Sequence, residues 1–145
     1  MAKAIHVANY LISMSVINSE RSITPLKLQK LLYFVQTSYY QRYRKTLFDE
    51  KVIYLKSGPF IESVYDEYKH HGYFSIPKDS YDFSDSISRL TNQEKEVIEH
   101  LFKQIGHLDG KFLEELFFME DLILFYSQKN SPIDFNNIEK IENIS

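Results

Sequence analysis

The sequence contains no cysteine and no tryptophan, and its 145 residues include only four glycines. Without cysteine there are no disulfides, no thiolate catalysis and no cysteine-ligated zinc site. The glycines are too few and too scattered for a phosphate-binding loop, and the common hydrolase, zinc-protease and calcium-binding motifs are absent. No apolar run approaches the roughly 18 residues of a membrane span, and the N-terminus lacks the features of a signal peptide. We therefore expect a soluble, cytoplasmic protein with no membrane contact.

Charge is low overall and unevenly distributed. The formal net charge is −3, which does not favour bulk attraction to nucleic acid. Residues 1–60 hold nine Lys/Arg and three Asp/Glu, whereas residues 61–145 hold eight and seventeen. Either the two halves pack together and offset each other, or the surface is bipolar and orients a charged partner.

Hydrophobic periodicity predicts a compact, mainly α (α+β) domain of five or six helices over residues 1–130. The predicted helices cover residues 2–17, 24–44, 59–72, 91–105 and 109–117, and the last either continues or is followed by a sixth over 119–128. A small β element is expected around residues 52–56, where β-branched and aromatic residues gather. The Asn-rich tail, residues 131–145, is expected to be loosely ordered.

Local signals set several of these boundaries. Thr24-Pro25 predicts an N-cap followed by proline at the first helical position, and Thr91 with Glu94 forms a capping box. Ser57-Gly58-Pro59 is expected to end the β element and to open the third helix. The residues expected on buried faces are Ala4, Ala8, Leu11, Ile12 and Val16 in the first helix, Leu28, Leu31, Leu32, Val35 and Tyr39 in the second, and Ile61, Val64, Tyr65 and Tyr68 in the third. Gln29 and Lys30 lie between leucines, so we expect at least one of them to face away from the core. In the turn-rich stretch of residues 73–88, the expected anchors are Phe74, Ile76 and Phe83.

Candidate catalytic and metal sites are sparse. Asp66 with His70, and Glu96 with His100, have the four-residue spacing with which a helix can present two metal ligands. The same spacing is typical of surface pairs, and no second ligand pair accompanies either one. We expect no catalytic residue, no metal and no cofactor, and hence no enzymatic activity.

Aromatic and basic residues alternate at the end of the second predicted helix. The residues concerned are Tyr39, Tyr40, Arg42, Tyr43 and Arg44. This pattern is found in platforms that bind single-stranded nucleic acid, and equally at helix ends whose rings enter the core while cations meet the helix dipole. Tyrosine and arginine are also the residues that dominate protein–protein hot spots. We predict that part of this segment contacts a protein partner.

An ordered set of motifs resembles one known family. The motifs are Val7-Ala8-Asn9-Tyr10, Thr24-Pro25-Leu26-Lys27, Leu28-Gln29-Lys30-Leu31-Leu32-Tyr33, Leu47-Phe48, Gly58-Pro59 and Val64-Tyr65. Together they resemble the Panacea domain, also described as the SocA-like antitoxin-associated domain of phage-associated proteins. The leucines, Gln29, Lys30, Tyr33, Gly58, Pro59 and Tyr65 are interpreted as structural parts of that signature.

The resemblance implies a toxin–antitoxin system. Family members neutralise a cognate toxin by direct protein contact, and one relative acts as an adaptor that delivers its toxin to a cytoplasmic protease. They are not known as enzymes. The alternatives are a phage or mobile-element protein that binds a host factor, and a nucleic-acid-binding regulator, although nucleic acid is the less expected partner.

Overall fold

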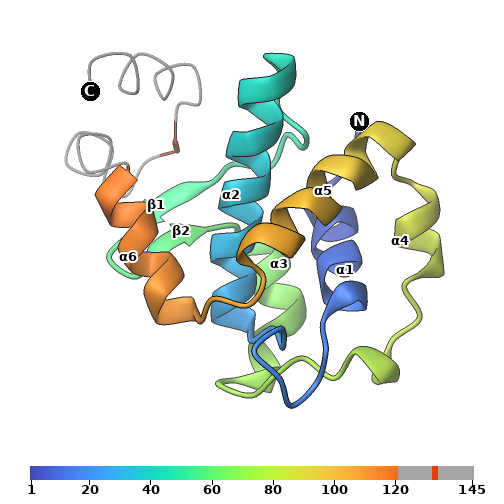
Figure 1. Ribbon diagram of the computed structural model, residues 1–145, viewed down its shortest axis with the longest axis vertical. Coiled ribbons are helices and arrows are strands. Elements are labelled where there is room, and N and C mark those ends of the chain that lie inside the picture. The colour runs from blue at the N-terminus through green and yellow to red at the C-terminus, as the bar shows by residue number, and fades with distance from the viewer. Residues whose placement is uncertain (121–131, 134–145) are drawn as a thin grey trace.

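Helix α2 is the element around which the rest of the chain is arranged (Figure 1). The computed structural model describes residues 1–120 and 132–133. The helices are α1 (Ala4–Met14), α2 (Pro25–Tyr43), α3 (Glu62–Tyr68), α4 (Ser84–Ser88), α5 (Asn92–Ile105) and α6 (Gly110–Glu120). A two-stranded sheet is formed by β1 (Ile53–Leu55) and β2 (Gly58–Phe60), and short 3₁₀ turns cover Lys69–His71 and Lys78–Ser80. The mainly α fold with a small β element is confirmed.

The other elements pack on several sides of α2. Helices α1, α3, α5 and α6 and strand β2 all contact it, while α1 also contacts α3, α4 and α5. Figure 1 shows α6 and the hairpin on one side of α2, with α1 and α5 on the other. No helix among the described residues is both long enough and apolar enough to cross a bilayer. Helix α6 continues through residues 119 and 120, and the remainder of the expected 119–128 helix and most of the 131–145 tail lie outside the described residues.

The predicted caps form as expected. The Thr24 hydroxyl accepts a hydrogen bond from the Lys27 N–H at 3.2 Å, and Pro25 occupies the first turn of α2. At α5, the Glu94 N–H donates to Thr91 Oγ1 at 3.1 Å and the Thr91 N–H donates to Glu94 Oε1 at 2.8 Å. Each cap satisfies donors that the first helical turn leaves without an intrahelical acceptor.

The expectation that Pro59 opens the third helix is wrong. Residues 58–60 instead form β2, which pairs antiparallel with β1 and places Pro59 opposite Tyr54. Proline is tolerated here because a two-stranded ladder leaves one edge of β2 unpaired. The tight reversal before β2 has Gly58 at φ +114°, which L side chains rarely adopt. Helix α3 begins only at Glu62, after the hairpin.

Two residues expected on buried faces are exposed. Val16 is exposed because α1 ends at Met14 and Ser15 is already extended, so the helical period does not reach it. Tyr65 is exposed on α3 and lies against Phe60, with ring centroids 5.2 Å apart. The five leucine, valine and tyrosine positions predicted for α2 are buried as expected.

Four polar side chains of α2 are also buried, namely Lys27, Gln29, Lys30 and Gln36. The expectation that Gln29 or Lys30 faces away from the core is therefore wrong. Its physical reason is the position of α2, because a helix contacted from several directions has no wide solvent face. These polar groups need partners inside the protein, since burial without a hydrogen bond is costly.

Gln36 shows how such a partner is supplied. Its Oε1 accepts from the Leu47 N–H at 2.7 Å and from the Phe48 N–H at 3.3 Å, and its Nε2 donates to the Phe48 carbonyl at 2.8 Å. One amide therefore satisfies three backbone groups of a buried loop segment. Leu47 and Phe48 can be buried outside a regular strand because this side chain, together with an isolated parallel bridge between Phe48 and Ala2, supplies partners for their backbone groups.

We predict that Gln36→Leu lowers the free energy of unfolding by about 3 kcal/mol, because several buried backbone groups lose their partner. Urea titration followed by circular dichroism measures the change. The matched control is Gln104→Leu, the same exchange at an exposed position of α5, which should change stability by less than about 0.5 kcal/mol. Equal effects in the two variants would contradict the role of Gln36.

Candidate functional site at the end of α2

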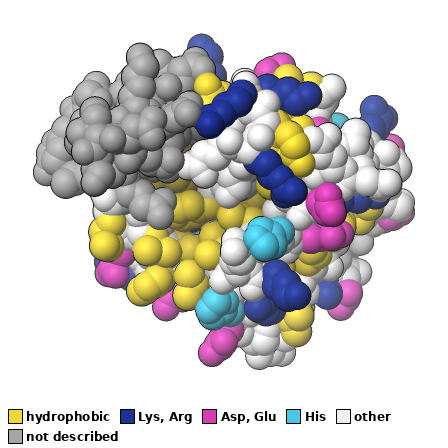
Figure 2. Space-filling model, turned by 45° about the horizontal axis from the view of Figure 1, so that its top comes forward, with side chains coloured by type: hydrophobic (Ala, Val, Ile, Leu, Met, Phe, Trp, Pro, Cys, Tyr) yellow, Lys and Arg dark blue, Asp and Glu magenta, His cyan; other side chains and the backbone are white. Residues whose placement is uncertain are grey.

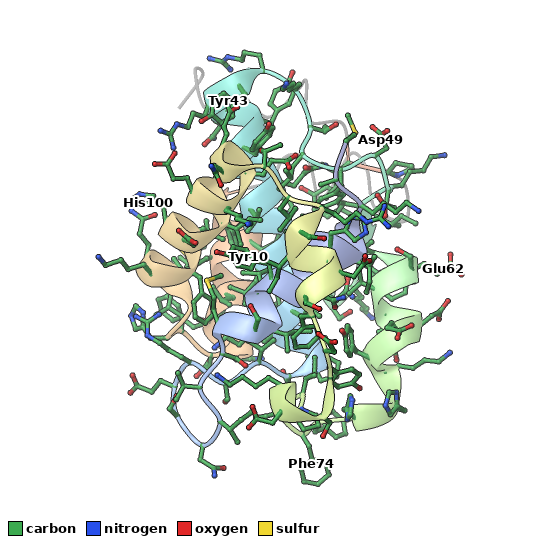
Figure 3. All side chains as sticks on the ribbon, turned by 90° about the vertical axis from the view of Figure 1, so that its right-hand side faces the viewer. Tyr10, Tyr43, Asp49, Glu62, Phe74 and His100 are labelled. Atoms are coloured by element: carbon green, nitrogen blue, oxygen red, sulfur yellow. The ribbon has the colours of Figure 1, made fainter. Side chains whose placement is uncertain are left out.

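The predicted partner-binding residues come together at the C-terminal end of α2. We call Tyr39, Tyr40, Arg42, Tyr43 and Arg44 the α2-end surface. Tyr39 is only 4% exposed and belongs to the core. Tyr40 and Tyr43 are half-buried, whereas Arg42 and Arg44 are exposed. Tyr43 lies at one extremity of the molecule (Figure 3).

The rings at this end support one another. Tyr39 and Tyr43 are one helical turn apart, and their ring centroids lie 4.8 Å from each other at an interplanar angle of 52°. Arg42 Cζ lies 5.5 Å from the Tyr43 ring centroid, within the range of a cation–π contact. Burial, with Glu94 nearby, raises the pKa of Tyr39, so this phenol stays neutral. A buried tyrosine thus contacts a half-buried tyrosine, which in turn lies against an exposed arginine.

The helix ends at Arg44, which turns the chain into the next loop. Arg44 has φ +59°, and its N–H donates to the Tyr40 carbonyl at 2.8 Å. This left-handed C-cap is usually occupied by glycine. The loop that follows encloses a pocket of about 460 Å³, lined by Tyr40, Arg44, Lys45, Asp49, Lys51, Ile133 and six further residues. The structure therefore places Tyr40 and Arg44 of the α2-end surface beside a hollow.

Cations predominate around this pocket. Arg44, Lys45 and Lys51 line it and are exposed, while Asp49 and Glu50 supply the carboxylates. Glu50 is committed elsewhere, because its Oε2 accepts from the Ala4 N–H at 2.9 Å at the start of α1. Figure 2 shows Lys and Arg side chains together with hydrophobic ones on the face that includes this end. The arrangement suits an acidic, partly apolar surface on a partner.

The candidate metal ligands do not assemble into a site. Within residues 1–120 and 132–133, no three His, Asp or Glu side chains are grouped closely enough to hold a metal. Asp66 forms an ion pair with Lys69 at 3.3 Å, and the His70 ring lies 4.0 Å from that of His71. Asp66 therefore contacts a cation one turn away.

The apolar part of the signature motif forms the core. Leu28, Leu31 and Leu32 are fully buried, and the Tyr33 ring packs edge-on against Phe117 of α6 at a centroid distance of 4.7 Å. Tyr54 of β1 contacts the same Phe117 ring at 5.0 Å. These contacts join α2, α6 and the hairpin, and they support the structural interpretation of the motif.

Gln29 fixes the start of α3. Its Oε1 accepts from the Ile61 N–H at 2.6 Å, and its Nε2 is 3.4 Å from the Ile61 carbonyl oxygen. Ile61 is the residue between β2 and α3, where neither the strand ladder nor the helix provides an acceptor for this N–H. The signature Gln29 and Gly58-Pro59 thus act on the same stretch of backbone from two directions.

Lys27 joins the connection between α1 and α2 to the C-terminal end of α5. Its Nζ donates to the carbonyls of Glu20 and Ser22, each at 3.0 Å, and of Gly106 at 2.7 Å. Burial lowers the pKa of Lys27 to about 8, although Asp109 nearby opposes the shift. Three carbonyl acceptors account for all three donors of the ammonium group.

Lys30 contrasts with Lys27. It is 1% exposed, and among the described residues its Nζ has no hydrogen-bond partner. A Cβ added at Gly58 would lie 3.7 Å from the Lys30 Cε, so the side chain passes close to the hairpin. Burial lowers the pKa of the Lys30 amine, and the negative charge of Glu114 on α6 opposes this shift. A buried cation with no partner lowers stability, and the structure offers no packing reason for it.

Sequence reasoning missed these polar contacts. Gln36 carried no signal, because an amide inside an apolar stripe looks the same whether it is buried or exposed. Lys27, Gln29 and Lys30 carried one signal: three polar residues within four consecutive helical positions point in different directions, and leucines stand between and beside them. That pattern predicts a helix enclosed on most sides.

Fold and candidate site together describe a mainly α domain with aromatic and cationic residues at the C-terminal end of α2. Comparison with protein-family models identifies it further: the model of the SocA-like antitoxin, Panacea domain, matches residues 28–121. The chain belongs to this family, and its resemblance in sequence motifs is confirmed. The family indicates an antitoxin-associated role and a toxin as the general kind of partner. Comparison with curated proteins and with solved structures gives no match.

We predict that Lys30→Met raises the free energy of unfolding by about 1 kcal/mol at neutral pH, because a buried unpaired ammonium is replaced by an apolar side chain of similar length. The folded pKa of Lys30 is lowered, so the unfolded chain binds more protons between that value and about 10.5. Wild-type stability therefore gains on the variant as pH rises through this window.

Chemical denaturation at a series of pH values measures both effects. Lys56→Met, at an exposed position, is the control and should leave stability within about 0.5 kcal/mol of wild type. A destabilised Lys30→Met variant would show instead that the amine has an internal partner.

Proposed function

We propose that this protein neutralises a cognate toxin by direct protein–protein contact through the α2-end surface. The observation that carries the proposal is the Tyr39–Tyr43–Arg42 stack, which presents a tyrosine and an arginine on a buried support in a chain of the antitoxin family. Steric capture of the toxin is the mechanism, without catalysis. The captured toxin is then passed to a cytoplasmic protease in an optional further step. A shortened lifetime of the toxin in cells would reveal this step.

The support for this surface is energetic. Tyrosine and arginine are the residues most often responsible for large losses of affinity when truncated to alanine. Positioning them in advance reduces the side-chain entropy lost on binding. Because Tyr39 fixes Tyr43 and the guanidinium of Arg42 rests near that ring, both groups are ordered before a partner arrives.

Charge indicates which partner surface fits. Arg44, Lys45 and Lys51 line a pocket whose carboxylates are Asp49 and Glu50, and Glu50 already accepts a hydrogen bond from the Ala4 N–H. A toxin surface with carboxylates around an apolar centre is complementary to it. Single-stranded nucleic acid is the rival ligand of the same residues, and a host protein bound by a phage-derived relative is a second rival.

We predict that Arg42→Ala and Tyr43→Ala each weaken binding of the purified toxin at least about tenfold, as expected for hot-spot residues. The toxin to be tested is the product of a small toxic reading frame adjacent to the gene. Isothermal titration calorimetry measures the dissociation constant, and growth rescue on co-expression tests neutralisation. The Arg42→Ala effect should shrink as salt rises from about 0.05 M to about 0.5 M.

Arg89→Ala is the matched control, because Arg89 is exposed at the end of α4 and pairs only loosely with Asp85, at 3.7 Å. It should bind toxin as the wild type does. Salt-dependent binding of the wild type to single-stranded DNA or RNA, lost in Arg42→Ala, would favour the nucleic-acid rival. Toxin that remains abundant in rescued cells indicates capture alone, and toxin that disappears indicates delivery to a protease.

A further inference from the structure

The ammonium of Lys30 is a buried charge for which the fold provides no partner. The residue is 1% exposed, and among the described residues its Nζ makes no hydrogen bond, whereas the Lys27 ammonium, one turn earlier in α2, reaches three carbonyls. Glu114 of α6 is near enough for its negative charge to act on the Lys30 amine, but within the described chain the two groups form no ion pair. Such a charge favours any arrangement that returns it to water.

Helix α6 packs directly beside Lys30 through Phe117. A Cβ added at Gly58 would lie 3.7 Å from Lys30 Cε and 3.9 Å from Phe117 Cδ2, so the lysine and the ring share one space under the hairpin. The same ring contacts Tyr33 of α2 and Tyr54 of β1. Removal of α6 would therefore uncover this side of the lysine.

Apolar contacts attach α6 to the rest of the described chain. Between Gly110 and Met119, only Leu113 and Phe117 are buried. The hydrogen bonds that α6 makes with described residues stay inside the helix or reach its cap at Asp109. Figure 1 shows α6 at the edge of the fold, beside the hairpin.

The neighbouring long helices have polar contacts with other segments as well. Gln29 and Gln36 join α2 to the backbone around it. In α5, the carbonyls of Phe102 and Lys103 accept hydrogen bonds from the Arg21 guanidinium at 2.9 Å and 3.3 Å. Helix α6 therefore has fewer contacts to lose on separation than α2 or α5.

The connection before α6 is anchored on the α5 side. Lys27 Nζ donates to the Gly106 carbonyl at 2.7 Å, and a Cβ added at Gly106 would lie only 2.4 Å from the Phe102 carbonyl oxygen. The chain therefore leaves α5 in close contact with it, and residues 107–109 separate this anchor from the start of α6. The end of α5 can keep its contacts while α6 moves.

We infer that α6 opens as a separate unit, detaching from α2 and the hairpin while the rest of the fold stays intact, because this step returns the Lys30 ammonium to water. Opening breaks the apolar contacts of Leu113 and Phe117, but it breaks no cap of another helix and none of the hydrogen bonds of Gln29 or Gln36. Elements with few buried contacts are the ones that open locally in folded proteins. The step requires no toxin, so it is independent of the proposed function.

A detached α6 does not remain a stable helix. It has 11 residues, and isolated helices shorter than about 12–15 residues are marginal in water. Its N–H groups therefore lose their intrahelical acceptors when α6 detaches. Amide hydrogen exchange detects such an opening residue by residue.

Native-state hydrogen exchange of the purified protein, followed by NMR in low concentrations of urea, tests the inference. After correction for intrinsic rates, the N–H groups of residues 114–117 in α6 should exchange at least about tenfold faster than those of Leu32 in α2 and Ile98 in α5. Their exchange should also depend less on urea, because opening of one helix exposes less surface than global unfolding.

Three variants separate the effect of Lys30 from general stability. Lys30→Met should slow exchange about fivefold in both α6 and α2, because residue 30 is hydrated in the opened form and in the unfolded chain alike. Ile98→Val, which shortens a buried side chain of α5, should speed exchange about fivefold in α2 and α5 but leave α6 unchanged. Lys111→Met, at an exposed position of α6, should change neither.

Three results would overturn the inference. Exchange in α6 that is as slow as in α2 and α5 would show that α6 opens only with the whole fold. Unchanged or faster α6 exchange in Lys30→Met would show that opening does not hydrate the lysine. Faster α6 exchange in Ile98→Val, by the factor seen in α5, would show a single cooperative unit. If Lys30→Met does not fold, Lys30→Leu provides the same comparison.

Discussion

The fold depends on polar side chains of α2 that satisfy backbone groups of the segments around it. Gln29 reaches Ile61, Gln36 reaches Leu47 and Phe48, and Lys27 reaches three carbonyls before and after it in the chain. Each of these contacts holds a stretch that has no regular secondary structure of its own. A loop can be buried only if its N–H and C=O groups find partners, and α2 provides them. The leucines of α2 can therefore be buried beneath these irregular segments without leaving the segments' backbone groups unsatisfied.

This constraint explains which parts of the fold the sequence could predict. The starts of α2 at Thr24 and of α5 at Thr91, and the end of α2 near Arg44, were predictable, because caps and turns depend on only three or four residues. The role of Gly58-Pro59 was not predictable from the sequence. Pairing with residues 53–55 and the hydrogen bond from the Ile61 N–H to Gln29 override the preference of proline for a helix start. Burial of Gln29 and Lys30 depends on contacts far along the chain, which periodicity within one helix does not contain.

The candidate site divides in the same way. The sequence predicted that tyrosines and arginines gather at the end of α2, and the structure adds that Tyr39 supports Tyr43 from inside the core. The expectation that Phe74 anchors its loop is wrong, because this side chain is exposed, and a Gly-Tyr-Phe turn resembles any loop with buried anchors. The exposure of Phe74 follows from its neighbours: Ile76 takes the core position, and Gly72 turns the chain outward just before the two rings.

Rigidity of α2 connects stability with binding. A helix that is packed on several sides and hydrogen-bonded to its surroundings holds the side chains at its C-terminal end in place, so less entropy is lost when they bind a partner. Lys30 lies within the same helix as a buried cation that lowers its stability. If Lys30→Met is more stable and binds toxin as the wild type does, rigidity exceeds what binding requires. If the added stability strengthens binding, small movements between α2, β2 and α6 limit the affinity of the natural chain.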